Sequence, residues 1–166
     1  YCCAPVLLFV LGYSLAKRFT SLAHFWLGAA LMLAPVASWV AIKGLTDMTV
    51  PLLLGAAVAF WVAGFDILYA CQDAEFDKGA GLHSVPARFG VRNSLRIAAA
   101  CHAVMVGLLV GVWLESPHLG DVFAAGLLAV AVLLVYEHSL VRPDDLTRVN
   151  RAFFQVNGVI SLGLFA

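Results

Sequence analysis

Long apolar runs, each ended by charged residues, glycine or proline, are the feature that most limits how this chain can fold. A spanning helix needs about 20 mostly apolar residues to cross a hydrocarbon layer roughly 30 Å thick. Six runs of suitable composition occupy about residues 2–15, 22–42, 50–70, 94–114, 120–140 and 150–166, and the first of them is short. The pattern predicts an all-α fold, a polytopic transmembrane helix bundle with about six helices.

The overall composition agrees with a lipid bilayer as the surroundings of most side chains. Of the 166 residues, 63% are hydrophobic and 12% are charged, and the mean hydropathy is +0.95. A soluble globular domain does not keep such a composition in water. The formal net charge is zero, so nothing in the overall charge indicates a nucleic acid or an acidic partner.

The basic residues are distributed unevenly along the predicted topology. If the chain crosses the membrane alternately, one side receives the connections 16–21, 71–93 and 141–149. With their flanks, these connections hold nine of the ten basic residues: Lys17, Arg18, Lys78, Arg88, Arg92, Arg96, Arg142, Arg148 and Arg151. Lys43 falls on the opposite side. The positive-inside rule therefore predicts that the first side is cytoplasmic.

Three carboxylates follow one another along the end of the third run. Asp66, Asp73 and Asp77 stand at positions i, i+7 and i+11. On one continuous helix they would lie on one narrow face, since each residue turns the helix by about 100°. Like charges on one stripe repel each other unless a cation lies among them. Mg²⁺ usually takes one or two protein carboxylates and completes its shell with water and phosphate oxygens, so the pattern predicts a diphosphate site.

A plainer reading of these acids remains open. Asp73 and Asp77, which Lys78 follows, also suit a solvated helix end. Asp66 is harder to explain in that way because it lies deeper in the apolar run, where a carboxylate is expensive and a functional role is the first hypothesis. Intramembrane carboxylates also mark ion pathways, so a transporter is the alternative outside enzyme chemistry. The repeated halves and broken midplane helices common in transporters are not visible in the sequence.

Three stretches resemble motifs of the UbiA-type polyprenyltransferases. The run DILYACQDAEFDKGAGLHSVPARFG, residues 66–90, is similar to the second Asp-rich motif of that family. The run YSLAKRFTSLAHFWLG, residues 13–28, resembles its YxxxK motif, and residues 136–158 resemble its last two helices with their connection. The first Asp-rich motif, of the form NDxxDxxxD, is absent, and we expect it to lie before Tyr1. By this resemblance, residues 1–166 form a single transmembrane prenyltransferase domain, the C-terminal two thirds of a nine-helix fold, and are inactive alone.

The resemblance also implies an activity. Enzymes of this family move a polyprenyl group from a polyprenyl diphosphate to an aromatic acid with the help of Mg²⁺, which neutralises charge on the leaving group. The acceptor implied here is 4-hydroxybenzoate, as in ubiquinone biosynthesis. A dihydroxynaphthoate, as in menaquinone biosynthesis, is the alternative. We expect an integral protein of the bacterial inner membrane with its active site facing the cytoplasm.

Seven residues are expected in the site. The resemblance implies that Asp73 and Asp77 are the Mg²⁺ ligands. It places Asp66 where it stabilises the allylic cation or positions the acceptor, with Tyr69 assisting one turn away. Lys17 is expected to be both catalytic and substrate-binding.

Tyr13 and Arg18 complete the expected set, since together with Lys17 they suit the diphosphate or the carboxylate of the acceptor. For Lys17 and Arg18 the alternative is a purely topological role, and for Tyr13 it is a place in the interfacial aromatic belt. His24, His102 and His118 are expected to be structural or interfacial, because none of them has a partner at metal-binding spacing.

Overall fold

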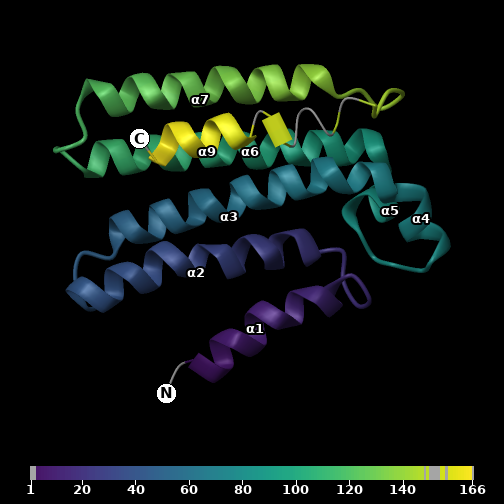
Figure 1. Ribbon diagram of the computed structural model, residues 1–166, viewed down its shortest axis with the longest axis horizontal. Helices are drawn as coiled ribbons and strands as arrows, with labels where there is room; N and C mark the ends of the chain where they lie inside the picture. The colour runs from purple at the N-terminus through teal and green to yellow at the C-terminus, as the bar shows by residue number, and fades with distance from the viewer. Residues whose placement is uncertain (1–2, 148, 150–153, 156, 166) are drawn as a thin grey trace.

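The structure, a computed structural model, describes residues 3–147, 149, 154–155 and 157–165, and these residues form helices and their connections without a strand. The elements are α1 (Cys3–Ala16), α2 (Ala23–Lys43), α3 (Thr49–Ala70), the 3₁₀ helix η1 (Cys71–Asp73), α4 (Ala74–Gly79), α5 (Val85–Phe89), α6 (Val91–Glu115), α7 (Asp121–Leu140) and α9 (Asn157–Phe165) (Figure 1). The prediction of an all-α fold is confirmed.

Four segments are long and apolar enough to cross a membrane. They are Ala23–Lys43, Thr49–Gly79, Val91–Glu115 and Asp121–Leu140. These four agree with the second to fifth predicted runs, with ends that differ by at most three residues except at Gly79, where the segment that contains α3 continues beyond the predicted end at residue 70. The first predicted run forms a shorter apolar helix. The sixth, 150–166, includes residues 150–153, 156 and 166, which lie outside the described part of the chain.

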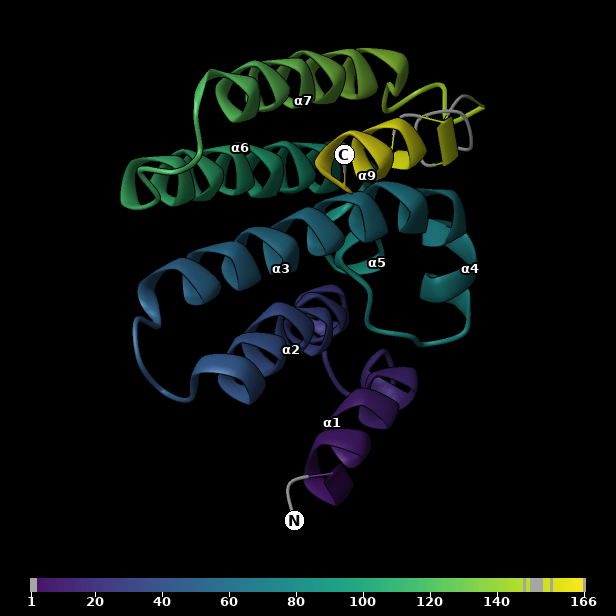
Figure 2. The same cartoon turned by 60° about the vertical axis from the view of Figure 1, so that its left-hand side comes forward.

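The long helices lie side by side in chain order. In both views α2 packs beside α3, α3 beside α6, and α6 beside α7, while α1 lies at the edge against α2 (Figures 1 and 2). Small residues let two of these pairs approach closely. A Cβ atom on Gly28 of α2 would collide with the Ala59 backbone of α3, and one on Gly64 of α3 would collide with the His102 ring of α6. Such close approaches are typical of helix packing in membranes.

The core lies where α3, α6, α7 and α9 meet. Ala57, Met105, Leu109, Val130, Leu134 and Ile160 form one buried apolar cluster there. Many large apolar side chains remain exposed on the outer faces, among them Leu8, Val122 and Leu162. Exposed apolar surface of this extent fits a helix bundle surrounded by lipid.

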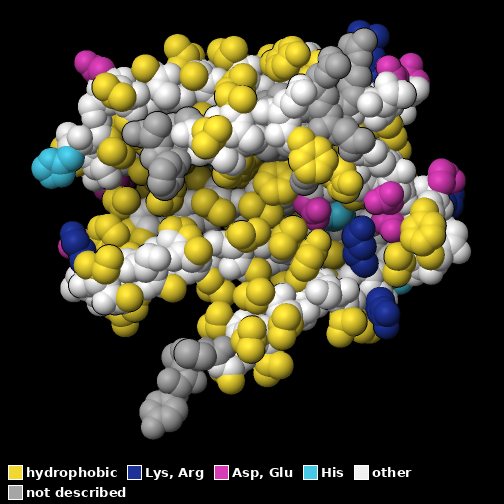
Figure 3. Space-filling model, viewed as in Figure 1, with side chains coloured by type: hydrophobic (Ala, Val, Ile, Leu, Met, Phe, Trp, Pro, Cys, Tyr) yellow, Lys and Arg dark blue, Asp and Glu magenta, His cyan; other side chains and the backbone are white. Residues whose placement is uncertain are grey.

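The chain crosses alternately, so its connections gather at two opposite ends. The connection between α1 and α2 lies at the same end as η1, α4 and α5 (Figure 1). The turns between α2 and α3 and between α6 and α7 lie at the other end. Most of the charged side chains visible in Figure 3 surround the first of these ends, which we call the polar end.

Candidate active site

The helix that carries Asp66 does not continue unchanged to Asp77. The α-helix α3 ends at Ala70, a 3₁₀ turn covers Cys71–Asp73, and α4 begins at Ala74. A 3₁₀ helix turns by about 120° per residue instead of about 100°, so three residues change the phase by about 60°. The narrow face that one continuous helix would give the three carboxylates is therefore not formed, in agreement with a spanning run that ends at residue 70. Asp73 is exposed, whereas Asp77 is buried.

Asp77 forms an ion pair with Lys17. The Lys17 Nζ atom lies 3.4 Å from Oδ2 of Asp77, and the two side chains are 31% and 4% exposed. Lys17 follows the last residue of α1, so the pair joins segments 60 residues apart. Removing a carboxylate from water is expensive unless it is paired, and the ammonium group supplies that pairing here.

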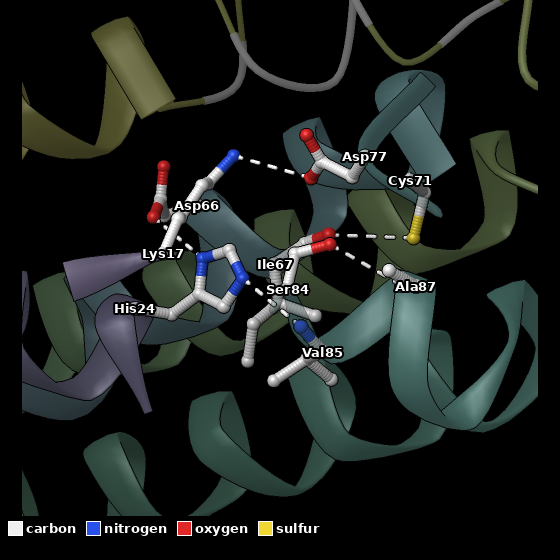
Figure 4. A network of polar contacts seen from close by, with 9 residues as sticks. All are labelled: Lys17, His24, Asp66, Ile67, Cys71, Asp77, Ser84, Val85 and Ala87. Atoms are coloured by element: carbon white, nitrogen blue, oxygen red, sulfur yellow. Dashed lines mark hydrogen bonds and ion pairs between the residues drawn. The ribbon is translucent and has the colours of Figure 1, made fainter. Parts of the chain in front are cut away.

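Asp66 is bound by a completely buried histidine. Nδ1 of His24, in the first turn of α2, lies 2.7 Å from Oδ2 of Asp66 (Figure 4). The backbone N–H of Val85 donates to Nε2 of the same ring at 3.4 Å. Because a backbone N–H can only donate, Nε2 is the acceptor, and the proton of the neutral ring is assigned to Nδ1. His24 therefore donates to the Asp66 carboxylate.

The 71–90 segment is attached to the connection between α1 and α2 by further contacts. The His83 backbone N–H donates to the Lys17 carbonyl at 2.6 Å, and Nη1 of Arg88 donates to Oγ of Ser21 at 3.1 Å. Ser84 is fully buried and begins α5, where its Oγ accepts from the Ala87 N–H at 3.2 Å. A side chain of this type at an N-cap satisfies one of the free N–H groups of the helix. At the polar end, the connection between α1 and α2 and the 71–90 segment are thus bound to each other.

The other expected residues lie around this unit. Tyr69 is half-buried, and its ring packs edge to face against Phe154 with centroids 6.5 Å apart. Tyr13 is half-buried in the last turn of α1, four residues before Lys17. Arg18 is exposed, and its backbone N–H donates to the Leu15 carbonyl at 3.0 Å.

Apolar cavities lie along α3 inside the bundle. One of about 420 Å³ is lined by side chains that include Trp61, Phe65 and Phe154. A second, of about 580 Å³, shares Val58 and Trp61 with the first and continues along α3 and α6. Phe65, which lines the first cavity, directly precedes Asp66 in α3. Cavities of this size and lining accept apolar ligands.

The carboxylates suit a hard cation without forming a complete protein cage. In the described part of the chain, no group of three His, Cys, Asp or Glu side chains gathers at metal-binding distances. Mg²⁺ does not need such a group, because it keeps water and phosphate ligands. Asp77 already holds a cationic group, the Lys17 ammonium, and the exposed Asp73 carboxylate does not cap α4. The oxygen donors of Asp73 and Asp77 are therefore of the chemical type that a divalent cation such as Mg²⁺ prefers.

Sequence reasoning missed the role of His24 in this site. The histidine is separated from Asp66 by 42 residues and from Val85 by 61, so no local spacing reveals either contact. One signal was available. Two antiparallel neighbours bring the start of the first helix beside the end of the second, and His24 and Asp66 hold these places in α2 and α3. His102, also expected to be structural, lies 2.9 Å from His138 between α6 and α7.

Comparison with known proteins places this geometry in context. The profile of the UbiA prenyltransferase family matches residues 1–159. A 4-hydroxybenzoate octaprenyltransferase of Aromatoleum aromaticum is 30% identical over 93% of the chain and 52% of its own length. One from Chromohalobacter salexigens is 33% identical over 85% and 46%.

A solved structure agrees with the fold. The apo structure of a UbiA homolog from Aeropyrum pernix K1 superposes with a TM-score of 0.81 at 30% identity. The match covers 97% of this chain and 61% of that chain. The chain spans about half the length of the curated relatives it matches.

Proposed function

The chain belongs to the UbiA prenyltransferase family, and on that premise we propose that it carries the second carboxylate cluster of an enzyme that transfers a polyprenyl group to an aromatic acid. The acceptor we propose is 4-hydroxybenzoate, because the relatives reported above are named for that acceptor. The observation that carries the proposal is the gathering of Asp66 and Asp77, with their partners His24 and Lys17, at the polar end of a bundle whose apolar cavity reaches Phe65, the residue before Asp66.

In this proposal the residues of the polar end bind the diphosphate. Asp73 and Asp77 would hold Mg²⁺. When bound, the ion neutralises the negative charge that develops on the departing diphosphate. Lys17 then exchanges the carboxylate of Asp77 for a phosphate oxygen, since an ammonium group forms charge-assisted hydrogen bonds with either. Tyr13, in the last turn of α1, and Arg18, just after this helix, supply further hydrogen-bond donors to the diphosphate.

The remaining residues act on the two organic groups. Cleavage of the C–O bond leaves an allylic cation, and the Asp66 carboxylate, with Tyr69 beside it, stabilises that charge or positions the acceptor. The ring attacks the cation at the carbon ortho to its hydroxyl, and loss of the ring proton restores aromaticity. The apolar lining, which includes Trp61 and Phe65, receives the prenyl tail and keeps water from the cation.

A direct assay tests the proposal. The natural full-length protein that contains this chain is purified in detergent and incubated with a polyprenyl diphosphate and 4-hydroxybenzoate. Mass spectrometry should find the prenylated acid in the presence of Mg²⁺ and not after addition of EDTA. A parallel reaction with a dihydroxynaphthoate decides between the two acceptors. If neither acceptor is prenylated, the proposed reaction is wrong, and transport by the same protein in proteoliposomes becomes the alternative to measure.

A further inference from the structure

His24 stands out among the polar residues that the proposed reaction does not use. It is 0% exposed, and both of its ring nitrogens are engaged, Nδ1 with Asp66 at 2.7 Å and Nε2 with the Val85 N–H at 3.4 Å. One imidazole therefore joins α2, the end of α3 and the start of α5. The shorter contact is the one with the Asp66 carboxylate, and the longer contact is the one with the Val85 backbone.

The contact with Asp66 leaves the carboxylate able to act. His24 donates to Oδ2 alone, and Figure 4 shows the second carboxylate oxygen of Asp66 directed away from the ring. The Asp66 side chain is still 19% exposed. A hydrogen bond to an ionised acceptor is about twice as strong as one between neutral groups. His24 thus anchors one oxygen of the Asp66 carboxylate, while the second oxygen is not held by the imidazole.

We propose that His24 is a positioning residue for prenyl transfer, which fixes the orientation of the Asp66 carboxylate through its Nδ1–H group. The inference rests on the proposed function, in which Asp66 faces the allylic cation or the acceptor. A carboxylate at the end of a short side chain rotates freely unless a partner fixes it, and a misplacement of about 1 Å at a reacting centre costs on the order of 100-fold in rate. The bond to Val85 holds the imidazole itself in place.

A purely structural role makes a different prediction. If His24 only connected α2 with the 71–90 segment, the Val85 contact would matter as much as the Asp66 contact. The two contacts can be separated, because they use different nitrogens of the ring. In His24→Asn the side-chain amide nitrogen falls near the place of Nδ1, so the donor to Asp66 is kept. In His24→Gln the amide group falls near the place of Nε2, so the acceptor for Val85 is kept and the donor is lost.

The experiment compares these two variants in the natural full-length protein. We expect His24→Gln to lower kcat by about 10- to 100-fold, the usual effect of losing a residue that orients a functional group. The KM for polyprenyl diphosphate and the half-saturating Mg²⁺ concentration should stay near the parent values, since Asp73 and Asp77 are untouched. His24→Asn should recover most of the lost rate. His83→Gln, a change of an exposed histidine in the same segment, is the matched control.

Several results overturn the inference. Equal losses in the two variants, or a larger loss in His24→Asn, assign the histidine to the loop contact. A raised KM for polyprenyl diphosphate with an unchanged kcat removes the link to Asp66. A parent that transfers no prenyl group overturns the proposed function and this inference together. An active parent whose two His24 variants lose the same fraction of kcat overturns the inference alone.

A measurement on the parent protein covers the case in which His24→Gln does not fold. In protein labelled with ¹⁵N-histidine, the signal that is missing from the His24→Asn spectrum belongs to His24. Its nitrogen shifts should show a protonated Nδ1 and an unprotonated Nε2. A ring protonated at Nε2 alone cannot donate to Asp66 and would overturn the inference.

Discussion

His24 and His102 are both enclosed histidines, with 0% and 2% exposure, yet they lie in different regions and have different partners. His24 lies at the polar end and donates to a part-exposed carboxylate. His102 lies farther along α6 and pairs with His138 of α7 at 2.9 Å. Glu137 lies 3.9 Å from the same ring nitrogen and is also buried.

The difference shows how a buried polar group in a membrane protein can be interpreted. Polar residues inside spanning helices act either at a functional site or as hydrogen-bonded links between helices. His24 reaches a carboxylate whose side chain is still 19% exposed, so its partner is available to a substrate. His102 reaches a second histidine between two helices, which is a link.

The first prediction concerns the side of the membrane on which the polar end lies. In a variant without the native cysteines, Glu75→Cys places a thiol at the polar end and Thr46→Cys places one at the other end, both at exposed positions. By the positive-inside rule, a membrane-impermeant maleimide added to intact cells should label Thr46→Cys only. Glu75→Cys should react only after the cells are permeabilised. The reverse pattern would place the carboxylates outside the cytoplasm.

The second prediction concerns Asp77 as a metal ligand. Asp77→Asn keeps the shape of the side chain but removes its charge, so we expect a loss of turnover on the order of 100-fold. The half-saturating Mg²⁺ concentration should rise, because a neutral amide binds a hard cation weakly. Glu75→Gln, which alters an exposed acid of the same helix, should change neither quantity.

The metal titration separates two roles for Asp77. A group that only transfers protons would lose turnover in Asp77→Asn with an unchanged Mg²⁺ requirement. That outcome would contradict the ligand assignment. Asp73→Asn tested in parallel shows whether the exposed carboxylate shares the role.

The third prediction uses the ion pair at the polar end. Lys17→Met should raise the KM for polyprenyl diphosphate by about tenfold, since a charge-assisted contact to phosphate is lost. The half-saturating Mg²⁺ concentration should fall, because the ammonium group no longer competes for Asp77, which it contacts at 3.4 Å. Lys78→Met removes an exposed charge of α4, also at the polar end, and serves as the control. A rise in both quantities, or equal effects in the control, would mean that Lys17 acts only through net charge.

The fold could be predicted from the sequence because its signal is local. The length and apolar character of a run are properties of consecutive residues, and four of the six predicted runs coincide with the long helices. Alternate crossing then placed Lys17 on the side of the carboxylates, and the structure brings its ammonium group to Asp77.

The details of the site depended on information that local patterns do not carry. The phase of Asp77 relative to Asp66 followed from an ideal helix, whereas the chain forms a 3₁₀ turn at Cys71–Asp73. The contact between His24 and Asp66 joins two helices, so it depends on how α2 packs on α3. The Gly28 backbone makes that close packing possible. The sequence alone does not show which helix a single glycine in an apolar run packs against.

The last prediction tests the link between α6 and α7 and has the smallest expected effect. Changing His138 to Leu leaves the buried His102 ring without its partner at 2.9 Å, and a stranded buried polar group costs about 1–3 kcal/mol of stability. His102→Leu should cost less, because the His138 ring that it strands is only half-buried. The double variant removes both polar rings, and replacing both partners by apolar groups of similar shape is nearly neutral. A cavity of about 460 Å³ beside both rings offers room for the new side chains.

Thermal unfolding in detergent should therefore place the midpoint of the double variant above those of both single variants. Prenyl transfer by all three should stay within about twofold of the parent, because the pair lies outside the proposed site. If the two losses simply add in the double variant, the imidazoles do not interact across the helix interface. If turnover falls with the midpoint unchanged, His102 belongs with His24 among the residues that serve the reaction, and the division between the two regions does not hold.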